Sequence, residues 1–212
     1  MTMTIDDAVR APNRPAGRRP ARRALALALL ASGLTACGTG ADDAGPPPLT
    51  ADEEAHARDV GGAAAATLQS TLAPRLMAAM QEDGPAGAVR FCAGAADSLT
   101  AAASEAAGVE VARTSLRVRN PDNAPDRWEE AALRHFQALV EAGDSLPAGW
   151  VQPVSAEEMR FYAPLRIAPL CVNCHGPRDA LAPGVAEILD AEYPDDRATG
   201  YRPGDLRGLV RV

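Results

Sequence analysis

The sequence contains no lysine, so all 21 of its basic residues are arginines. Six of these arginines precede residue 37 together with two aspartates, and the rest of the chain carries 15 arginines against 26 acidic residues, a formal charge of −11. Binding to nucleic-acid phosphates needs a concentrated basic surface, which this composition does not supply. We therefore expect a solvated acidic surface and no nucleic acid as a partner.

Internal repeats, sustained heptads and apolar runs of membrane-spanning length are also missing from the sequence. The apolar run over residues 24–34 is short and follows an arginine-rich stretch, as in an export signal. It ends at Leu34-Thr35-Ala36-Cys37, a pattern typical of bacterial lipoprotein signals, in which the cysteine is diacylated and becomes the first residue. We predict that residues 1–36 are a lipoprotein signal peptide, and that Cys37 anchors the exported protein by lipid on the periplasmic side of a bacterial membrane.

Two alternatives to a lipoprotein signal stay open. Ordinary signal cleavage nearby leaves Cys37 as a free thiol in a flexible tail. Paired arginines at 18–19 and 22–23 are a feature of twin-arginine export, although the flanking residues fit that pattern poorly. Residues 37–50 are small and rich in glycine and proline, which predicts a flexible tether. Residues 51–212 suit one globular domain.

This domain is predicted to begin with two helices. Thr50 and Glu53 have the spacing of a capping box, and the alanine-rich stretch to about residue 81 carries apolar residues at helical intervals, with Pro74 at a kink or break. After Gly84-Pro85, a second helix is expected over residues 86–107. Cys92 belongs to its apolar stripe and is therefore expected to face inward.

The remainder of the domain mixes strands and helices. Alternating residues on either side of Thr114 predict two short strands or one strand with a bulge, and Pro164 indicates that its own strand lies at a sheet edge. Asp126 and Glu129 mark a capped helix start. Strands are expected over residues 109–119, 161–167 and 206–212, and helices over residues 126–141 and 183–191. With no parallel βαβ pattern, the mixture predicts an α+β fold.

The motif that carries chemistry is Cys171-Val172-Asn173-Cys174-His175, the C-x-x-C-H signature of haem c attachment. Two thiols separated by two residues reach the two vinyl groups on one edge of the porphyrin, and the next histidine is then held below the iron. We expect Cys171 and Cys174 to attach one haem c covalently, and His175 to be its proximal iron ligand.

A C-x-x-C pair has two other functions to consider. Structural zinc normally takes four ligands, and the sequence has no second closely spaced cysteine or histidine pair. A thioredoxin-type dithiol would open a helix after a buried strand of a parallel sheet, and the pattern of such a sheet is missing. Haem maturation takes place outside the cytoplasm, in agreement with the export signal, so the motif favours haem.

The second axial position of the iron has several candidate ligands. Cys92 remains after lipid and haem attachment have used the other cysteines, and exported proteins seldom keep an unpaired cysteine without a reason. An inert buried thiol is the alternative. Met159, His135 and His56 are further candidates, each with a structural role as its simpler interpretation. The residues alone leave this ligand open.

Several blocks occur in a distinctive order: Phe91-Cys92, residues 113–121 (RTSLRVRNP), Trp128-Glu129, residues 161–165 (FYAPL), the CVNCH motif, residues 198–201 (ATGY) and residues 204–208 (GDLRG). Together they resemble bacterial single-haem c domains with a PAS-like fold, a family long catalogued as a domain of unknown function. The resemblance spans roughly residues 51–212. It implies an antiparallel sheet with long N-terminal helices and flanking helices, and His175 and Cys92 as axial ligands.

The leading hypothesis is therefore a haem protein of electron transfer or of redox or ligand sensing, and we do not expect an enzyme. Its expected partner is a separate redox or signalling protein, and its expected midpoint potential is low because thiolate donates strongly to ferric iron. The alternatives are a peroxidase-type haem enzyme with an open sixth position, for which no convincing distal histidine–arginine pair is visible, and a haem-free interaction lipoprotein. Arg113, Arg117 and Arg119 are candidate partners of the haem propionates, with exposed ion pairs as the alternative role.

Overall fold

The computed structural model describes residues 45–212, and the expected signal peptide, Cys37 and the first part of the tether lie outside the described residues. The described chain combines helices with a four-stranded antiparallel sheet, so the predicted α+β class is confirmed. The helices are α1 (Ala51–Ala107), α2 (Arg127–Ala142), α3 (Val172–His175) and α4 (Val185–Glu192), and the strands are β1 (Ala112–Thr114), β2 (Trp150–Pro153), β3 (Met159–Arg166) and β4 (Leu206–Arg211).

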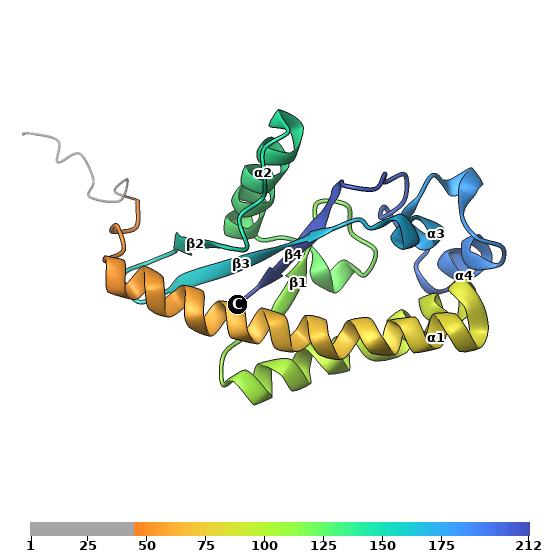
Figure 1. Ribbon diagram of the computed structural model, residues 1–212, viewed down its shortest axis with the longest axis horizontal. Coiled ribbons are helices and arrows are strands. Elements are labelled where there is room, and N and C mark those ends of the chain that lie inside the picture. The colour runs from red at the N-terminus through yellow and green to blue at the C-terminus, as the bar shows by residue number, and fades with distance from the viewer. Residues whose placement is uncertain (1–44) are drawn as a thin grey trace, which may run out of the picture. The chain divides into compact units, whose positions relative to one another are not determined.

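The long helix α1 is a hairpin of two helical arms, residues 51–83 and 85–107 (Figure 1). Gly84 joins the arms with φ 67 and ψ −171, a conformation that is essentially restricted to glycine. The predicted division at Gly84 is therefore confirmed. Pro74 lies within the first arm, and the helical dihedral angles continue through it. The predicted capping box is present, because Glu53 accepts from the Thr50 backbone N–H while its own N–H donates to the Thr50 hydroxyl.

The sheet has the strand order β1-β4-β3-β2, and every neighbouring pair is antiparallel. The prediction that Pro164 marks an edge strand is wrong, because β3 lies between β4 and β2. Phe161 exchanges both backbone hydrogen bonds with Val212, so by alternation Pro164 occupies a non-hydrogen-bonded position opposite Leu209. Its nitrogen faces the β2 side, where pairing has already ended at Tyr162, and the missing N–H therefore costs no ladder bond.

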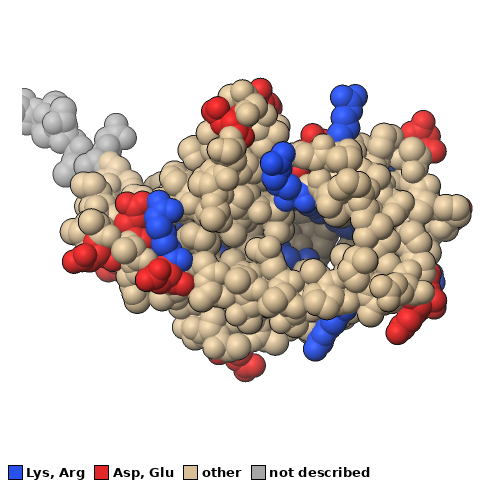
Figure 2. All heavy atoms as spheres, in the orientation of Figure 1, with Lys and Arg blue, Asp and Glu red and all other residues tan. Residues whose placement is uncertain are grey.

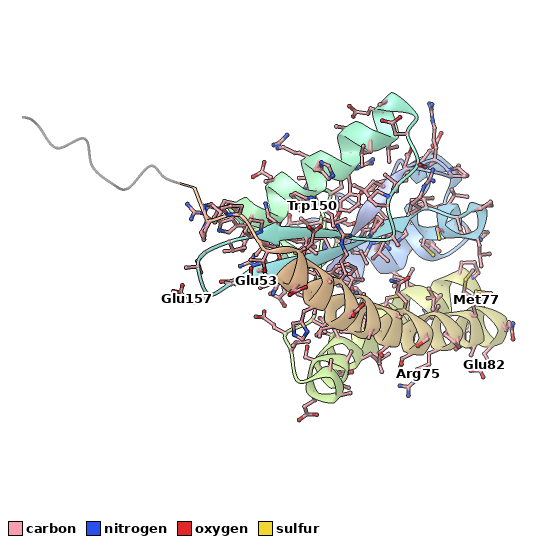
Figure 3. The ribbon with its side chains drawn as sticks, turned by 60° about the vertical axis from the view of Figure 1, so that its left-hand side comes forward. Glu53, Arg75, Met77, Glu82, Trp150 and Glu157 are labelled. Atoms are coloured by element: carbon pink, nitrogen blue, oxygen red, sulfur yellow. The ribbon has the colours of Figure 1, made fainter. Side chains whose placement is uncertain are left out.

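The two faces of the sheet pack against different helices. Phe161 belongs to a buried cluster with the first arm of α1, and Tyr162, the next residue, belongs to a cluster with α2 that also contains Phe136. This alternation places α1 and α2 on opposite sides of the sheet, as Figure 1 shows. Trp150, labelled in Figure 3, lies at the α2 side, where its ring stacks on His135 with centroids 4.6 Å apart.

The predicted strand over residues 109–119 is shorter than expected, because only β1 pairs with the sheet. The backbone N–H of Arg117 donates to the Ser115 hydroxyl, which in turn donates to the carbonyl of Arg207. These bonds turn the chain away from the sheet immediately after Thr114. The residues that follow run beside α3 and the loop before β4, where Arg119 donates to the Cys174 carbonyl and the Val118 carbonyl accepts from the N–H of Arg197.

At the other end of β3, a 3₁₀ turn (Pro169–Cys171) leads directly into α3. The helix α4 then packs on the second arm of α1 through Val89, Val185 and Leu189. No helix among residues 45–212 combines the length and apolar character needed to cross a membrane.

Candidate functional site

The CVNCH segment forms a single helical turn. Cys171 ends the 3₁₀ turn, α3 covers the next four residues, and the N–H of Gly176 closes the turn on the Val172 carbonyl at 2.9 Å. A side chain at Gly176 would place its Cβ 2.5 Å from that carbonyl oxygen, which explains the glycine. Cys171 and Cys174 are half-buried free thiols three residues apart, a spacing that puts both side chains on one face of a helical turn.

His175 is oriented through its Nδ1 atom, which lies 2.7 Å from the carbonyl oxygen of Ala198. A carbonyl only accepts, so Nδ1 carries the proton and Nε2 keeps its lone pair. Burial, with smaller effects from Arg207 and Arg119, holds the pKa of His175 well below its usual value. The imidazole is therefore neutral at pH 7, which is the form that binds a metal.

The loop that supplies the Ala198 carbonyl is itself held by a buried ion pair. Arg119 lies 3.1 Å from the Asp196 carboxylate, and the side chains are 10% and 2% exposed. Arg119 Nη2 also donates to the Cys174 carbonyl at 2.6 Å, while Asp196 accepts from the N–H of Ala198 at 2.8 Å. One ion pair thus fixes both α3 and the carbonyl that orients His175.

The second arm of α1 brings Cys92 to this segment. The thiol of Cys174 lies 3.7 Å from the Pro85 carbonyl at the start of that arm, and Val89, one turn before Cys92, shares an apolar cluster with Cys174. Burial raises the pKa of the Cys174 thiol to about 11, and negative charge at Cys92 and Cys171 adds to the increase. The second arm of α1 therefore packs beside the turn that carries Cys171, Cys174 and His175, and Cys92 lies on this arm within range of the charge of Cys174.

Positive charge surrounds Cys92. Burial raises the pKa of its half-buried thiol, and the nearby guanidinium groups of Arg119, Arg113 and Arg207 oppose that increase. All three come from β1, the segment after it, or β4. Figure 2 shows the surface hollowed beside α1 and α3, with basic atoms at the floor of the hollow. A thiolate in this environment is stabilised by charge although it is removed from water.

The three arginines named from the sequence have different roles. Arg119 forms an ion pair with Asp196, and Arg113 forms one with Asp97 at 2.5 Å. Arg117 is exposed and lies over the ring of Tyr201, with Cζ 4.0 Å from the ring centroid. Two of these three candidates are therefore engaged in ion pairs with protein carboxylates.

The other candidate iron ligands lie elsewhere. Met159 packs at the start of β3 against the cluster between the sheet and α1, and His135 is exposed on α2, stacked on Trp150. His56 is exposed in the second turn of α1, far along the first arm from Gly84. Among the described residues of this candidate set, Cys92 is the one whose own helical arm packs on α3, through Pro85 and Val89.

The two alternatives to haem for the cysteine pair were a structural zinc site and a thioredoxin-type dithiol. A structural zinc ion takes four ligands, and residues 45–212 hold no group of three or more His, Cys, Asp or Glu side chains suited to a metal ion. The sheet that leads into α3 is antiparallel at every strand pair, in contrast to the parallel sheet of a thioredoxin-type site.

Sequence reasoning missed three participants of the site: Asp196, Ala198 and Arg207. Ala198 acts through its carbonyl group, for which no side-chain signal exists. Asp196 is one of several acidic residues in its loop, and only the fold pairs it with Arg119, 77 positions away. Ala198 and Arg207 do lie in the blocks 198–201 and 204–208, which carry the family resemblance. That resemblance was the only sequence signal that could have pointed to these two residues.

A family model described as Tll0287-like matches residues 49–212. Among solved structures, the crystal structure of the cyanobacterial haem protein Tll0287 is similar, with 26% sequence identity, coverage of 57% of this chain and 68% of that chain, and a TM-score of 0.47. The search of curated protein sequences gave no significant match.

Proposed function

The chain belongs to the Tll0287-like family, and on that basis we propose that it is an exported, lipid-anchored c-type haem protein that transfers electrons or senses a redox change or a ligand. The protein that gives the family its name is described as a haem protein. The observation that carries the proposal is His175: its Nδ1 is bound by Ala198, which leaves Nε2 free beside two unpaired thiols.

The residues fit covalent haem attachment. Each thiol of Cys171 and Cys174 would add across one vinyl group, forming a carbon–sulfur bond while the thiol hydrogen goes to the neighbouring carbon. This addition consumes no oxidant or reductant. Both thiols are free and half-buried, and both lie on the helical turn that ends at His175. The apolar residues around Cys171 and Cys174, including Val172 and Leu181, suit a porphyrin edge.

We assign the proximal iron position to His175 and the distal position to Cys92. The neutral imidazole is held in one tautomer by the Ala198 carbonyl, which is the usual way in which a protein orients a ligating histidine. Cys92 lies on the second arm of α1, which packs beside α3. Burial raises the pKa of its thiol on balance, and three nearby arginines offset part of the cost of a thiolate there. A PAS-like arrangement of sheet and flanking helices is part of the same proposal.

A haem held by these residues would supply a one-electron change between ferric and ferrous iron. The residues that bind the iron determine whether this redox change serves electron transfer, sensing or catalysis. If His175 and Cys92 both bound the iron, they would leave no open position for peroxide, so this assignment favours electron transfer or sensing over peroxidase chemistry. Release of Cys92 would open a position for a small ligand, which links the redox state to sensing. The partner is a separate redox or signalling protein.

Covalent haem staining tests the proposal. The full-length protein, exported in a host with a haem c maturation system, is expected to retain haem on a denaturing gel. Cys171→Ala and Cys174→Ala should each weaken the stain, and the double variant should abolish it. Cys92→Ala is the matched control, because this cysteine is not an attachment site and its variant should stain like the wild type. Absence of stain on the exported wild-type protein contradicts the proposed function.

Membrane anchoring is tested separately. Radiolabelled palmitate should be incorporated into the exported protein, and Cys37→Ala should abolish both the label and the recovery of the protein with membranes. Haem staining of the released variant should persist, because the domain at residues 51–212 does not depend on the anchor. Equal membrane recovery of wild type and Cys37→Ala would remove the lipid anchor from the proposal while leaving the haem assignment intact.

A further inference from the structure

Arg207 is an exception among the enclosed arginines of the protein. Five arginines among residues 45–212 are half-buried. Four of them form ion pairs with carboxylates: Arg113 with Asp97, Arg119 with Asp196, Arg160 with Asp126 and Glu158, and Arg211 with Glu110 and Glu129. Arg207 forms none with any described residue. An enclosed charge without a counter-charge is costly, so this position calls for an anion.

Neutral groups hold the guanidinium of Arg207 in place. Its Nη1 atom donates to the Ser115 hydroxyl at 2.8 Å and to the Arg117 carbonyl at 3.3 Å. Its Cζ lies 5.7 Å from the ring centroid of Tyr201, a ring that Arg117 also covers. The surroundings therefore fix the side chain and add a second positive charge nearby. The one nearby carboxylate that acts on Arg207 belongs to Asp196, which forms its ion pair with Arg119 and not with Arg207.

The position of Arg207 connects it to the candidate haem site. Tyr201 stands between them, because its ring meets the His175 imidazole edge to face with centroids 6.2 Å apart. The positive charge of Arg207 also reaches both His175 and Cys92, since it is one of the charges that lower the pKa of each. The basic floor of the hollow in Figure 2 agrees with a cation in this region.

We propose that Arg207 is the ion-pair partner of a haem propionate, an inference that rests on the proposed function. A guanidinium binds a carboxylate through two parallel hydrogen bonds, and haem brings two carboxylates to the site. A free anion is a poorer occupant, because the chain beyond residue 36 has a formal charge of −11 and repels anions from solution. Arg119 and Arg113 are already paired, which leaves Arg207 as the enclosed arginine available to this group.

The test uses the haem-loaded protein with Arg207→Gln and Arg207→Lys. Resonance Raman spectroscopy reads the bending band of the haem propionates, and a redox titration reads the midpoint potential. Arg207→Gln should shift the propionate band to lower frequency and lower the midpoint potential, because a positive charge that favours ferrous iron is lost. Arg207→Lys keeps the charge but not the paired geometry, so it should restore the potential towards wild type while the band stays shifted. Arg202→Gln, an exposed arginine before β4, is the matched control and should change neither reading.

Separate outcomes overturn the inference and the proposed function. If the wild-type protein carries covalent haem but the Arg207 variants leave the propionate band unchanged, the inference is wrong and the proposed function stands. If Arg207→Gln does not load haem, Arg207→Lys decides the question through the same band. Addition of acetate at constant ionic strength should leave the wild-type band and potential unchanged. A saturable response to acetate would identify an exchangeable anion at Arg207 and overturn the assignment.

Discussion

The guanidinium of Arg119 and the carboxylate of Asp196 form an ion pair of 3.1 Å that is almost completely enclosed. The pair joins two segments that are far apart in the sequence, the stretch after β1 and the loop before β4. Through the Cys174 and Ala198 backbone groups it also holds α3 and the carbonyl that orients His175. The stability of the domain and the geometry of the site therefore depend on the same two side chains.

Removal of one partner of this pair should be strongly destabilising. We expect Asp196→Ala to reduce the free energy of unfolding by about 3 to 5 kcal/mol, because an enclosed guanidinium is left without its counter-charge. Urea unfolding followed by circular dichroism measures the change. The matched control is Glu130→Ala, which removes an exposed ion pair with Arg134 and should cost less than about 1 kcal/mol.

A double variant separates charge from packing at this position. Arg119→Met combined with Asp196→Leu removes both charges together, and should be more stable than Asp196→Ala alone because no charge remains unpaired. If the double variant is no more stable than Asp196→Ala, the loss comes from the backbone hydrogen bonds of the pair and not from the unpaired charge.

Local sequence patterns were sufficient to predict where the main helices begin and where α1 turns. The capping boxes at Thr50 and Asp126 are both present, and the hairpin turn falls at the predicted Gly84. These features are determined by residues three or four positions apart, so a sequence pattern contains them. The CVNCH motif is local in the same sense, since all five residues of the attachment signature are consecutive.

The pairing of strands and of side chains far apart in the chain could not be predicted from such local patterns. The strand β2 was not predicted from the sequence. The position of Pro164 was predicted wrongly, because a proline is excluded from an inner strand only where a neighbouring strand would need its N–H, and the pairing of β2 with β3 ends before Pro164. The site depends equally on distant contacts: Arg119 meets Asp196 across 77 positions, and Arg207 meets Ser115 across 92. Patterns over a few residues carry no information about such pairs.

The packing of Phe161 on α1 gives a second prediction. An added Cβ at Gly61 would lie 2.4 Å from the Cβ and Cγ atoms of Phe161. We expect Gly61→Ala to lose about 1 to 3 kcal/mol of stability through overpacking, despite the better helix propensity of alanine. Gly62→Ala is the control, because it meets no atom within 4 Å and should be stabilised by about 0.5 to 1 kcal/mol. Equal effects of the two variants in urea unfolding would contradict this packing.

The hairpin turn of α1 gives a third prediction. Gly84 has φ 67 and ψ −171, so Gly84→Ala should cost about 1 to 3 kcal/mol through backbone strain even though space for a side chain is open. Gly94→Ala lies in the helical part of the second arm, also with open space, and should be stabilising. In the haem-loaded protein, Gly84→Ala should also alter the visible spectrum, since this turn brings the Cys92 arm to α3. A stability equal to wild type would contradict the turn.

The last prediction concerns the distal ligand. In the haem-loaded protein, Cys92→Ala should convert a six-coordinate low-spin ferric spectrum with thiolate features into a high-spin one, because the variant removes the proposed sixth ligand and alanine cannot replace it. The midpoint potential should rise at the same time, since thiolate stabilises ferric iron. His135→Gln, His56→Gln and Met159→Leu are controls that remove the other candidate ligands, and each should leave the spectrum unchanged.

The two readings together distinguish ligation from mere proximity. A nearby thiol that does not bind iron would alter neither the spin state nor the thiolate bands when it is replaced, whereas a ligand alters both. An unchanged spectrum in Cys92→Ala would remove Cys92 from the iron, and a high-spin spectrum in the wild type would favour the peroxidase alternative with an open sixth position. Because Cys92→Ala leaves Cys171 and Cys174 in place, covalent haem staining should be equal in both proteins, so a change in spectrum cannot be attributed to lost haem.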